Sequence, residues 1–276
     1  MHTDAYAWLH VFKFMTNEIP VLPKIIWSLW LQGWDEASEI VRSCITSWKR
    51  LNPEWDIRLL TREHVHRLLF PTSPFARLVD LDLPPEALSD VVRLELLARF
   101  GGVWADATTY CLIPLDGWLG PAVTQGFFAF DRPGPDRMLA SWFLAAPPAS
   151  PVVLIWRDLA EKYWAERSQR DTYFWVHDLF ARAYETDPST RRIWDATPKR
   201  SADGPHVFAP YQSTLYAPLA EPARQIVDTG TTPMLKLTHK LNAVASDRGT
   251  LYRWLCDRER SDSFGAPVES WTGTFE

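Results

Sequence analysis

One helix–turn–strand segment constrains the fold more than any other stretch of this chain. Pro84-Pro85 sets the start of a predicted helix over 85–100, because proline is favoured in the first helical turn. Gly101-Gly102 ends the helix in the manner of a left-handed C-cap. A short apolar strand over 103–105 follows and carries Asp106 near its carboxyl end. Ligands of open α/β sheets gather at that end of the strands, so the segment predicts an α/β fold with a site around Asp106.

The chain before this segment alternates predicted strands and helices. The stretch 24–30 is β-branched and aromatic, and 56–60 is a second short strand. Helices are expected over 37–51, where apolar residues recur at helical spacing, and up to Leu69 from an N-cap at Thr61. This strand–helix–strand–helix order favours parallel pairing through right-handed crossovers.

The pattern after Pro114 is less regular. Strands are expected over 126–130 and within 225–238, the second of them returning to the sheet edge, and 188–211 is rich in loop residues. Further helices are expected over 138–146, 151–165 and 173–184. No internal repeat or low-complexity block is visible, so the sequence predicts one α/β domain with extra helices.

Composition and charge exclude several classes of protein. The net charge is −5 and no run of Lys and Arg is present, so nucleic acid is not an expected partner. Cys44, Cys111 and Cys256 are odd in number and widely spaced, which argues against a disulfide framework or a structural zinc site. Small buried thiols in a reducing cytoplasm fit better. The 15 tryptophans favour a carbohydrate ligand, because flat indole faces stack on sugars.

The N-terminal stretch 5–15 bears on location. It is apolar, but Asp4 precedes it and no small-residue cleavage site follows, so it lacks the features of a secretory signal. No apolar run approaches the ~20 residues that span a bilayer. Trp8 and Phe12 leave open an interfacial helix at the inner face of the membrane. We expect a cytoplasmic protein, with peripheral membrane association as the alternative.

Asp90, Arg93 and Asp106 form the candidate catalytic set. Asp90 and Arg93 lie three apart on the predicted helix, so their side chains share one face and can form a surface salt bridge or converge on one ligand. The glycine pair and Asp106, which follow directly in the sequence, favour convergence on a ligand over a simple salt bridge. Arginine offers a planar donor fork to phosphate or ribose oxygens, while aspartate accepts from sugar hydroxyls. Asp106 is placed to bind a divalent cation that neutralises a leaving diphosphate.

The residues around this set resemble a known family. The runs LSDVVRLELL (88–97) and GGVWADAT (101–108) look like the signature of capsular polysaccharide synthesis proteins. These belong with sugar transferases that have a DXD motif, including yeast-type mannosyltransferases and the glucosyltransferase domain of large clostridial toxins. Weaker matches follow in the same order along most of the chain, at 23–27, 32–33, 141–143, 163–164, 173–174 and 235–240.

The resemblance implies a GT-A-like, Rossmann-type domain with a nucleotide-sugar donor, Mn²⁺ or Mg²⁺, and retention of anomeric configuration. It implies that Trp27 stacks near the donor base and that Asp90 and Arg93 hold the ribose and sugar region. Asp106 would meet the metal and diphosphate. Within this fold, Gly101-Gly102 permits a tight turn and close backbone approach to the donor.

Thr108 departs from the DXD pattern, in which a second carboxylate stands at this place. A hydroxyl is a weaker, uncharged ligand for a hard cation, although the capsular branch commonly reads Asp-Ala-Thr. His239 is a candidate to complete a metal site with Asp106 and Thr108, or else it is a core or surface histidine. Lys236 and Lys240 are four apart and either neutralise the diphosphate or are solvated.

The implied reaction is transfer of a hexose from a UDP- or GDP-sugar to a hydroxyl of a glycan or lipid-linked glycan, in capsular or other surface polysaccharide synthesis. The donor part would span about 23–125 and the acceptor part about 126–258, between an N-terminal extension 1–20 and a tail 259–276. His177-Asp178 is either an acceptor-side base or structural. Two alternatives stay open: a nucleotide-sugar-binding protein without activity, and a glycan-binding or hydrolase protein.

Overall fold

A computed structural model describes residues 21–241, 248–260 and 268–275 of this chain. The N-terminal extension 1–20, with the apolar stretch 5–15, lies outside the described residues. Within the described part, no helix is both long enough and apolar enough to cross a bilayer.

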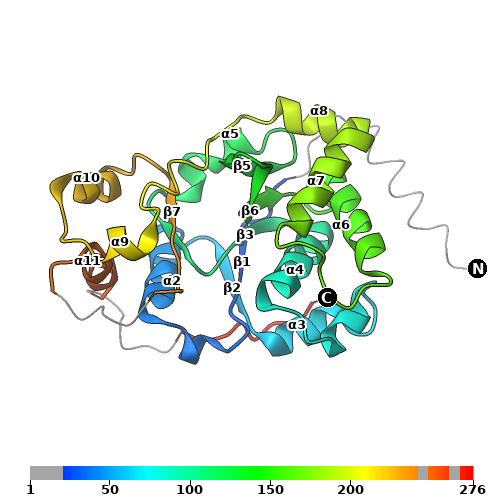
Figure 1. The fold of residues 1–276 in the computed structure, drawn as a ribbon, viewed down its shortest axis with the longest axis horizontal. Coiled ribbons are helices and arrows are strands. Elements are labelled where there is room, and N and C mark those ends of the chain that lie inside the picture. Colours follow the sequence, from blue (N-terminus) through cyan, green and yellow to red (C-terminus); the bar gives the residue numbers. More distant parts are fainter. Residues whose placement is uncertain (1–20, 242–247, 261–267, 276) are drawn as a thin grey trace, which may run out of the picture.

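A five-stranded mixed sheet forms the centre of the molecule (Figure 1), with strand order β2-β1-β3-β6-β5. Its first three strands pair in parallel, β6 runs antiparallel to β3, and the edge strand β5 runs antiparallel to β6. The predicted α/β class and the parallel pairing of the first two strands are confirmed. The strands are β1 (Ile25–Leu29), β2 (Asp56–Leu60), β3 (Gly102–Ala105), β5 (Phe128–Gly134) and β6 (Arg137–Ala146).

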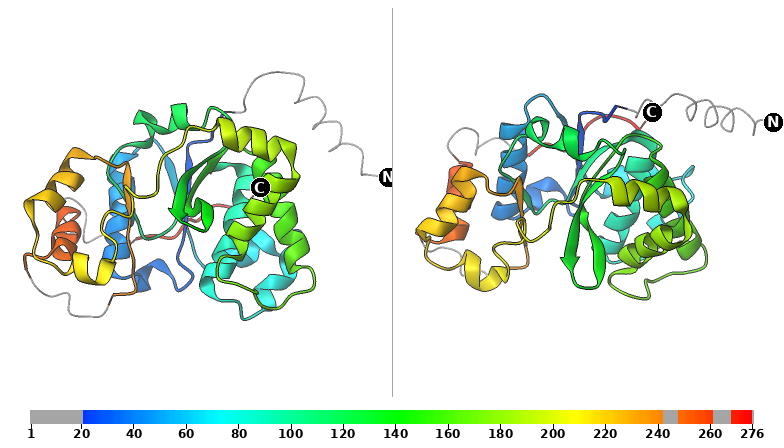
Figure 2. Two further views of the ribbon diagram at one scale, coloured as in Figure 1. Left: turned by 45° about the horizontal axis from the view of Figure 1, so that its top comes forward. Right: turned by 90° about the horizontal axis from the view of Figure 1, so that it is seen from above.

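Helices cover both faces of this sheet (Figures 1 and 2). On one face α4, α6 and α7 pack against one another and against β3 and β6, with Leu94, Trp104 and Trp156 among the fully buried residues. On the other face α2 brings Trp48 against Phe143 of β6, with the rings stacked at 6.2 Å. The helices are α2 (Glu39–Leu51), α3 (Arg62–Leu69), α4 (Pro85–Phe100), α6 (Pro151–Trp164), α7 (Trp175–Thr186) and α8 (Pro188–Ala196).

A second, two-stranded sheet lies beside α2 and pairs β4 with β7 in antiparallel fashion. Three short helices lie beyond it and form a separate cluster with α2 (Figure 2, left). These elements are β4 (Thr109–Cys111), β7 (Met234–Lys236), α9 (Tyr211–Leu215), α10 (Glu221–Thr229) and α11 (Leu251–Arg258). The remaining short elements are α5 (Leu119–Ala122) and the 3-10 helices η1 (Trp34–Glu36), η2 (Ala76–Asp80) and η3 (Leu115–Gly117).

The prediction of a helix over 138–146 is wrong, because this segment belongs to strand β6 of the central sheet. β6 pairs with β3 on one edge and β5 on the other, and both its faces are covered by helices, so residues 139–146 are all buried. A strand buried on both faces is apolar almost throughout. It therefore shows no alternation by which it could be told from a buried helix.

The expectations for 188–238 are wrong in part. The region predicted as loop contains α8, and α10 occupies the first residues of the predicted edge strand. Only Met234–Lys236 is extended, and it pairs with β4 instead of returning to the central sheet. The three cysteines are buried free thiols, as expected.

The C-terminal tail is held more tightly than its polar sequence indicates. Glu259, predicted to begin a tail, is 3% exposed and accepts hydrogen bonds from Tyr110 Oη and Arg50 Nη2. Further on, Trp271 and Phe275 pack against Trp27 of β1 at ring distances of 6.0 and 6.2 Å. These two rings anchor the tail to the core beside β1.

Candidate active site

The strand order reverses at β1, which has β2 on one side and β3 on the other. Ligands of open α/β sheets bind outside the carboxyl ends of the strands at such a point. Trp30 directly follows β1 and Asp106 directly follows β3, and both line a cavity of about 490 Å³. This volume suits a small-molecule ligand.

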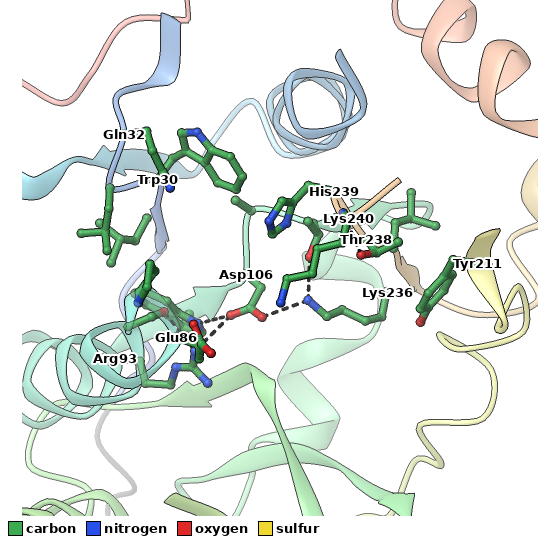
Figure 3. Close-up of a pocket in the computed structure, with 18 of the residues that line it drawn as sticks. Trp30, Gln32, Glu86, Arg93, Asp106, Tyr211, Lys236, Thr238, His239 and Lys240 are labelled. Carbon is green, nitrogen blue, oxygen red and sulfur yellow. Dashed lines mark hydrogen bonds and ion pairs between the residues drawn. The ribbon is translucent and has the colours of Figure 1, made fainter. Parts of the chain in front are cut away.

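Asp106 lies at the centre of this cavity, between Arg93 on one side and Lys236 on the other (Figure 3). Oδ1 accepts from the indole N–H of Trp104 at 2.9 Å and from Arg93 Nη2 at 3.3 Å, and Oδ2 accepts from Lys236 Nζ at 2.9 Å. Burial favours the protonated acid, but Lys236 and Arg93 outweigh it and hold the pKa of Asp106 below its ordinary value. Asp106 is therefore a carboxylate at neutral pH.

Local backbone contacts fix Asp106. Its N–H donates to the carbonyl of Trp142 in the neighbouring strand at 2.9 Å. Its own carbonyl accepts from both the N–H and the hydroxyl of Thr109, at 2.9 and 2.7 Å. Both backbone groups of Asp106 are therefore hydrogen-bonded, which fixes the position from which its carboxylate projects.

Arg93 and Asp90 form the ion pair expected from their spacing, at 2.8 Å between Nη1 and Oδ1. Asp90 and Arg93 are 7% and 4% exposed, so the interpretation as a surface salt bridge is wrong. Arg93 also donates to the carbonyl of Ser141 at 2.9 Å and to Ser89 Oγ at 3.0 Å. Burial raises the pKa of Asp90 to about 7, against the lowering effect of Arg93.

A second cavity of about 210 Å³ adjoins the first. Asp90, Ser141 and His177 line only this second cavity, whereas Arg93, Asp106 and Lys236 line both. The charged array therefore forms a common wall between a larger and a smaller compartment. Burial, with Arg93 and Arg137 nearby, lowers the pKa of His177 to about 4, so this histidine is neutral at pH 7.

The structure brings four further predicted residues to the larger cavity: Thr108, Lys236, His239 and Lys240. Lys236 donates to Thr108 Oγ1 at 2.6 Å as well as to Asp106. His239 stands edge-on to Trp30 with ring centroids 5.0 Å apart (Figure 3). Burial and the two lysines lower the pKa of His239, which keeps its ring neutral.

Trp27 does not lie at the cavity, contrary to the role that the resemblance gave it. Its side chain is 0% exposed, and its indole N–H donates to the carbonyl of Gly101 at 2.9 Å. The ring packs on Phe100 and on the C-terminal tail. Trp30 is the indole of this segment that reaches the cavity.

Gly101 and Gly102 are also absent from the cavity lining. Both have positive φ, +65° and +94°. A Cβ on Gly101 would lie 2.4 Å from the backbone nitrogen of Pro148, and one on Gly102 would lie 2.7 Å from the carbonyl oxygen of Ile25. The close backbone approach predicted here exists, but it is made to neighbouring protein backbone, so these glycines position the strand that carries Asp106.

The predicted metal ligands do not form a divalent-cation site in this arrangement. Of Asp106, Thr108 and His239, only Asp106 is a carboxylate, and both its oxygens accept from cationic side chains. The ammonium of Lys236 bridges Asp106 and Thr108. Over the described ranges, no three His, Cys, Asp or Glu side chains are grouped so that they could hold a metal ion.

Some cavity residues escaped the sequence analysis. Trp30 could have been found from its place directly after a strand, by the rule that selected Asp106. Glu86, His206 and Tyr211 come from helices and loops far apart in the chain and carry no local signal, and Tyr173 appears in the sequence only within the weak family match at 173–174. Asp178, paired with His177 in the sequence, accepts instead from Thr172 Oγ1 at 3.2 Å and lines neither cavity.

Comparison with known proteins gives a family and several relatives. A family model described as "Capsular polysaccharide synthesis protein" matches residues 3–255. The chain is 28% identical over 176 residues to O-glycosyltransferase braB of Annulohypoxylon truncatum, covering 57% of this chain and 40% of that protein. It is 25% identical over 165 residues to O-glycosyltransferase PaGT of Phomopsis amygdali, covering 54% and 40%. The aligned part is thus about two fifths of the length of these relatives.

Solved structures show weaker likeness. "PaToxG Glycosyltransferase" aligns with a TM-score of 0.43 and 14% identity, covering 75% of this chain and 94% of that one. The glycosyltransferase GlyE of Streptococcus pneumoniae TIGR4 aligns with a TM-score of 0.43 and 10% identity, covering 89% and 62%.

Proposed function

This chain belongs to the capsular polysaccharide synthesis protein family, and we propose that it is a glycosyltransferase which moves a hexose from a UDP- or GDP-linked donor to a hydroxyl of a glycan. The observation that carries the proposal is the partly buried Arg93–Asp106–Lys236 array at the reversal point of the sheet. The relatives named O-glycosyltransferase support the type of reaction.

The charge of the larger cavity suits a diphosphate. Arg93, Lys236 and Lys240 line it together with two carboxylates, Glu86 and Asp106, which leaves one net positive charge. Arg93 is held by Asp90 and Ser141, so its planar fork is oriented before a ligand arrives. Fixed donors of this kind stabilise the negative charge that grows on a leaving nucleoside diphosphate.

We assign the donor base to the end of the cavity near Trp30, whose indole offers a flat face for stacking. The sugar would then lie toward the smaller cavity, where Asp90 and Asp106 can accept from its hydroxyls. This placement is the one expected of a GT-A-like donor domain. The division into a donor part (about 23–125) and an acceptor part (about 126–258) needs one refinement, because Lys236 of the second part reaches the donor cavity.

The chemistry that these residues support is positioning and charge stabilisation. Retention of configuration, a lipid-linked or other glycan acceptor and a role in capsular or other surface polysaccharide synthesis are parts of the same proposal and rest on the family. A cytoplasmic location is also part of it, with peripheral association at the inner membrane face as the alternative that the apolar stretch 5–15 leaves open. If Mn²⁺ or Mg²⁺ takes part, Asp106 is the one carboxylate in the predicted ligand set that can hold it.

Incubation with a panel of UDP- and GDP-sugars and glycan acceptors tests the proposal, read out by released nucleotide and by the mass of the glycosylated product. We expect one donor to be consumed and Asp106→Asn to lower the rate at least ~10²-fold, since one preorganised electrostatic group contributes that much. Asp158→Asn, at an exposed position of α6, is the matched control.

Two other outcomes would favour the alternatives. Tight nucleotide binding with no turnover would favour a nucleotide-sugar-binding protein without activity. Glycan binding without any response to nucleotides would favour the hydrolase or glycan-binding alternative.

A further inference from the structure

The ammonium of Lys236 bridges Asp106 and Thr108, the two side chains at the DXD-like positions. Nζ is 2.9 Å from Asp106 Oδ2 and 2.6 Å from Thr108 Oγ1. An ammonium has three N–H donors, so these two bonds leave one for a ligand oxygen. Figure 3 shows the lysine reaching Asp106 from the side of the cavity opposite Arg93.

The backbone around Lys236 is fixed independently of any ligand. β7 pairs with β4 so that Lys236 lies opposite Thr109. The N–H of Leu237 donates to the carbonyl of Thr108 at 2.8 Å, and the N–H of Lys236 donates to Pro205 at 2.8 Å. The lysine side chain is 17% exposed. Little conformational freedom therefore remains to be lost when a ligand binds.

The charges of this cluster balance without a metal ion. Two carboxylates and a divalent cation would sum to zero. Here Thr108 is neutral in place of the second carboxylate, and Lys236 supplies one positive charge opposite Asp106, which again sums to zero. Arg93 lies 3.3 Å from the same carboxylate and is balanced in turn by Asp90, 2.8 Å away. A divalent ion placed here would meet one carboxylate and two like charges, which is unfavourable.

We propose that Lys236 is the fixed cation of the donor site and that this chain binds the diphosphate of its donor without a divalent metal. Thr108 stands where a second acidic residue would help to bind a metal cation. Lys236 of β7 supplies the positive charge at this place instead. This inference rests on the proposed function, because it assigns the cation that faces the donor's diphosphate.

Isothermal titration calorimetry on the full chain, freed of metal and checked by elemental analysis, tests the proposal. UDP and GDP are titrated in EDTA and again in excess Mn²⁺. For the nucleotide that binds, we expect the two Kd values to agree within about threefold. Affinity that is lost in EDTA and restored at least about tenfold by Mn²⁺ would overturn the proposal.

Lys236→Met keeps an unbranched side chain, one heavy atom shorter than lysine, and removes the charge. We expect its affinity in EDTA to fall at least about tenfold, because a charge-assisted contact to phosphate is lost. Mn²⁺ should restore part of this loss, since Asp106 then has an oxygen available. Lys162→Met, on the exposed side of α6, is the matched control and should bind as the unmodified chain does. Unchanged affinity of Lys236→Met in EDTA would refute the role of the lysine.

The two proposals fail in different ways. No binding of UDP, GDP or their sugars in either buffer would reject the nucleotide-sugar function and this inference with it. Binding that requires Mn²⁺ would reject only the inference. If Lys236→Met does not fold, as judged by near-UV circular dichroism, the comparison of EDTA with Mn²⁺ on the unmodified chain decides alone.

Discussion

Trp27 and Trp30 are three residues apart and lie in different surroundings. Successive side chains of a strand point to opposite faces, and Trp30 lies beyond the end of β1, so a motif alone does not tell which indole meets a ligand. The fully buried Trp27 faces α4 and the tail. Local spacing, by contrast, was enough to predict the Asp90–Arg93 pair, because residues three apart on a helix are neighbours.

Substituting each tryptophan separates the two roles. Trp30→Ala should weaken nucleotide binding about tenfold, because a stacking contact of ~1–3 kcal/mol is lost, with little effect on stability. Trp27→Ala should lower the free energy of unfolding by about 3–5 kcal/mol, since it leaves a cavity in the core. Calorimetric titration and urea unfolding measure the two effects. A Trp30→Ala variant that binds nucleotide normally would place the base elsewhere.

Asp90 should make stability depend on pH. Its pKa is about 7 in the folded chain against an ordinary value of 3.8. The folded state thus holds the proton more tightly, so the stabilisation from this group is complete below about pH 4, declines up to about pH 7 and is constant above. Asp90→Asn cannot titrate at this position. The Tm of the unmodified chain minus that of Asp90→Asn should therefore fall between pH 4 and 7, and a constant difference would contradict the shift.

At the scale of elements, the sequence predicted best where strong start and stop signals exist. The helix Pro85–Phe100 has the predicted bounds, because Pro84-Pro85 marks its start and Gly101-Gly102 follows it. β6 was mistaken for a helix, because a strand buried on both faces has no alternating pattern. The short strand β7 was only loosely placed, since its partner β4 lies more than a hundred residues away in the chain.

The turn after α4 should tolerate no side chain at Gly101. A Cβ there would lie 2.4 Å from the backbone of Pro148, and φ is +65°. Gly101→Ala should destabilise the chain by at least about 1–3 kcal/mol from backbone strain, with the clash added. Gly120→Ala is the control, because nothing lies within 4 Å of its Cβ position and it sits in the short helix α5. Urea unfolding that gives equal stability for both variants would contradict this account.

At the scale of the whole molecule, the candidate site depends on contacts between remote segments. Trp30, Arg93 and Asp106 come from the first half of the chain and Lys236 from near its end. The sequence could supply the residue types, and the family pattern supplied Asp106 and Thr108. It could not show that Lys236 lies between them, because the pairing of β4 with β7 sets that geometry.

The C-terminal tail stabilises the same framework without lining either cavity. The N–H of Trp271 donates to the carbonyl of Leu59 in β2 at 2.9 Å, and its carbonyl is 2.5 Å from His64 Nε2. Arg58 contacts the rings of both Trp27 and Trp271, at 4.8 Å from each centroid. The tail thus closes one end of the core around β1 and β2, although it lines neither cavity.

Trp271→Ala should therefore lower stability and leave the donor site unchanged. The lost aromatic packing around Trp27 predicts a decrease of about 2–4 kcal/mol in the free energy of unfolding, less than for a fully buried tryptophan because Trp271 is partly exposed. The Kd for the nucleotide should stay within about twofold, since additivity holds for sites without shared partners. Trp271→Phe keeps an aromatic ring and should recover most of the stability. A large rise in Kd with intact stability would instead show that the tail takes part in the site.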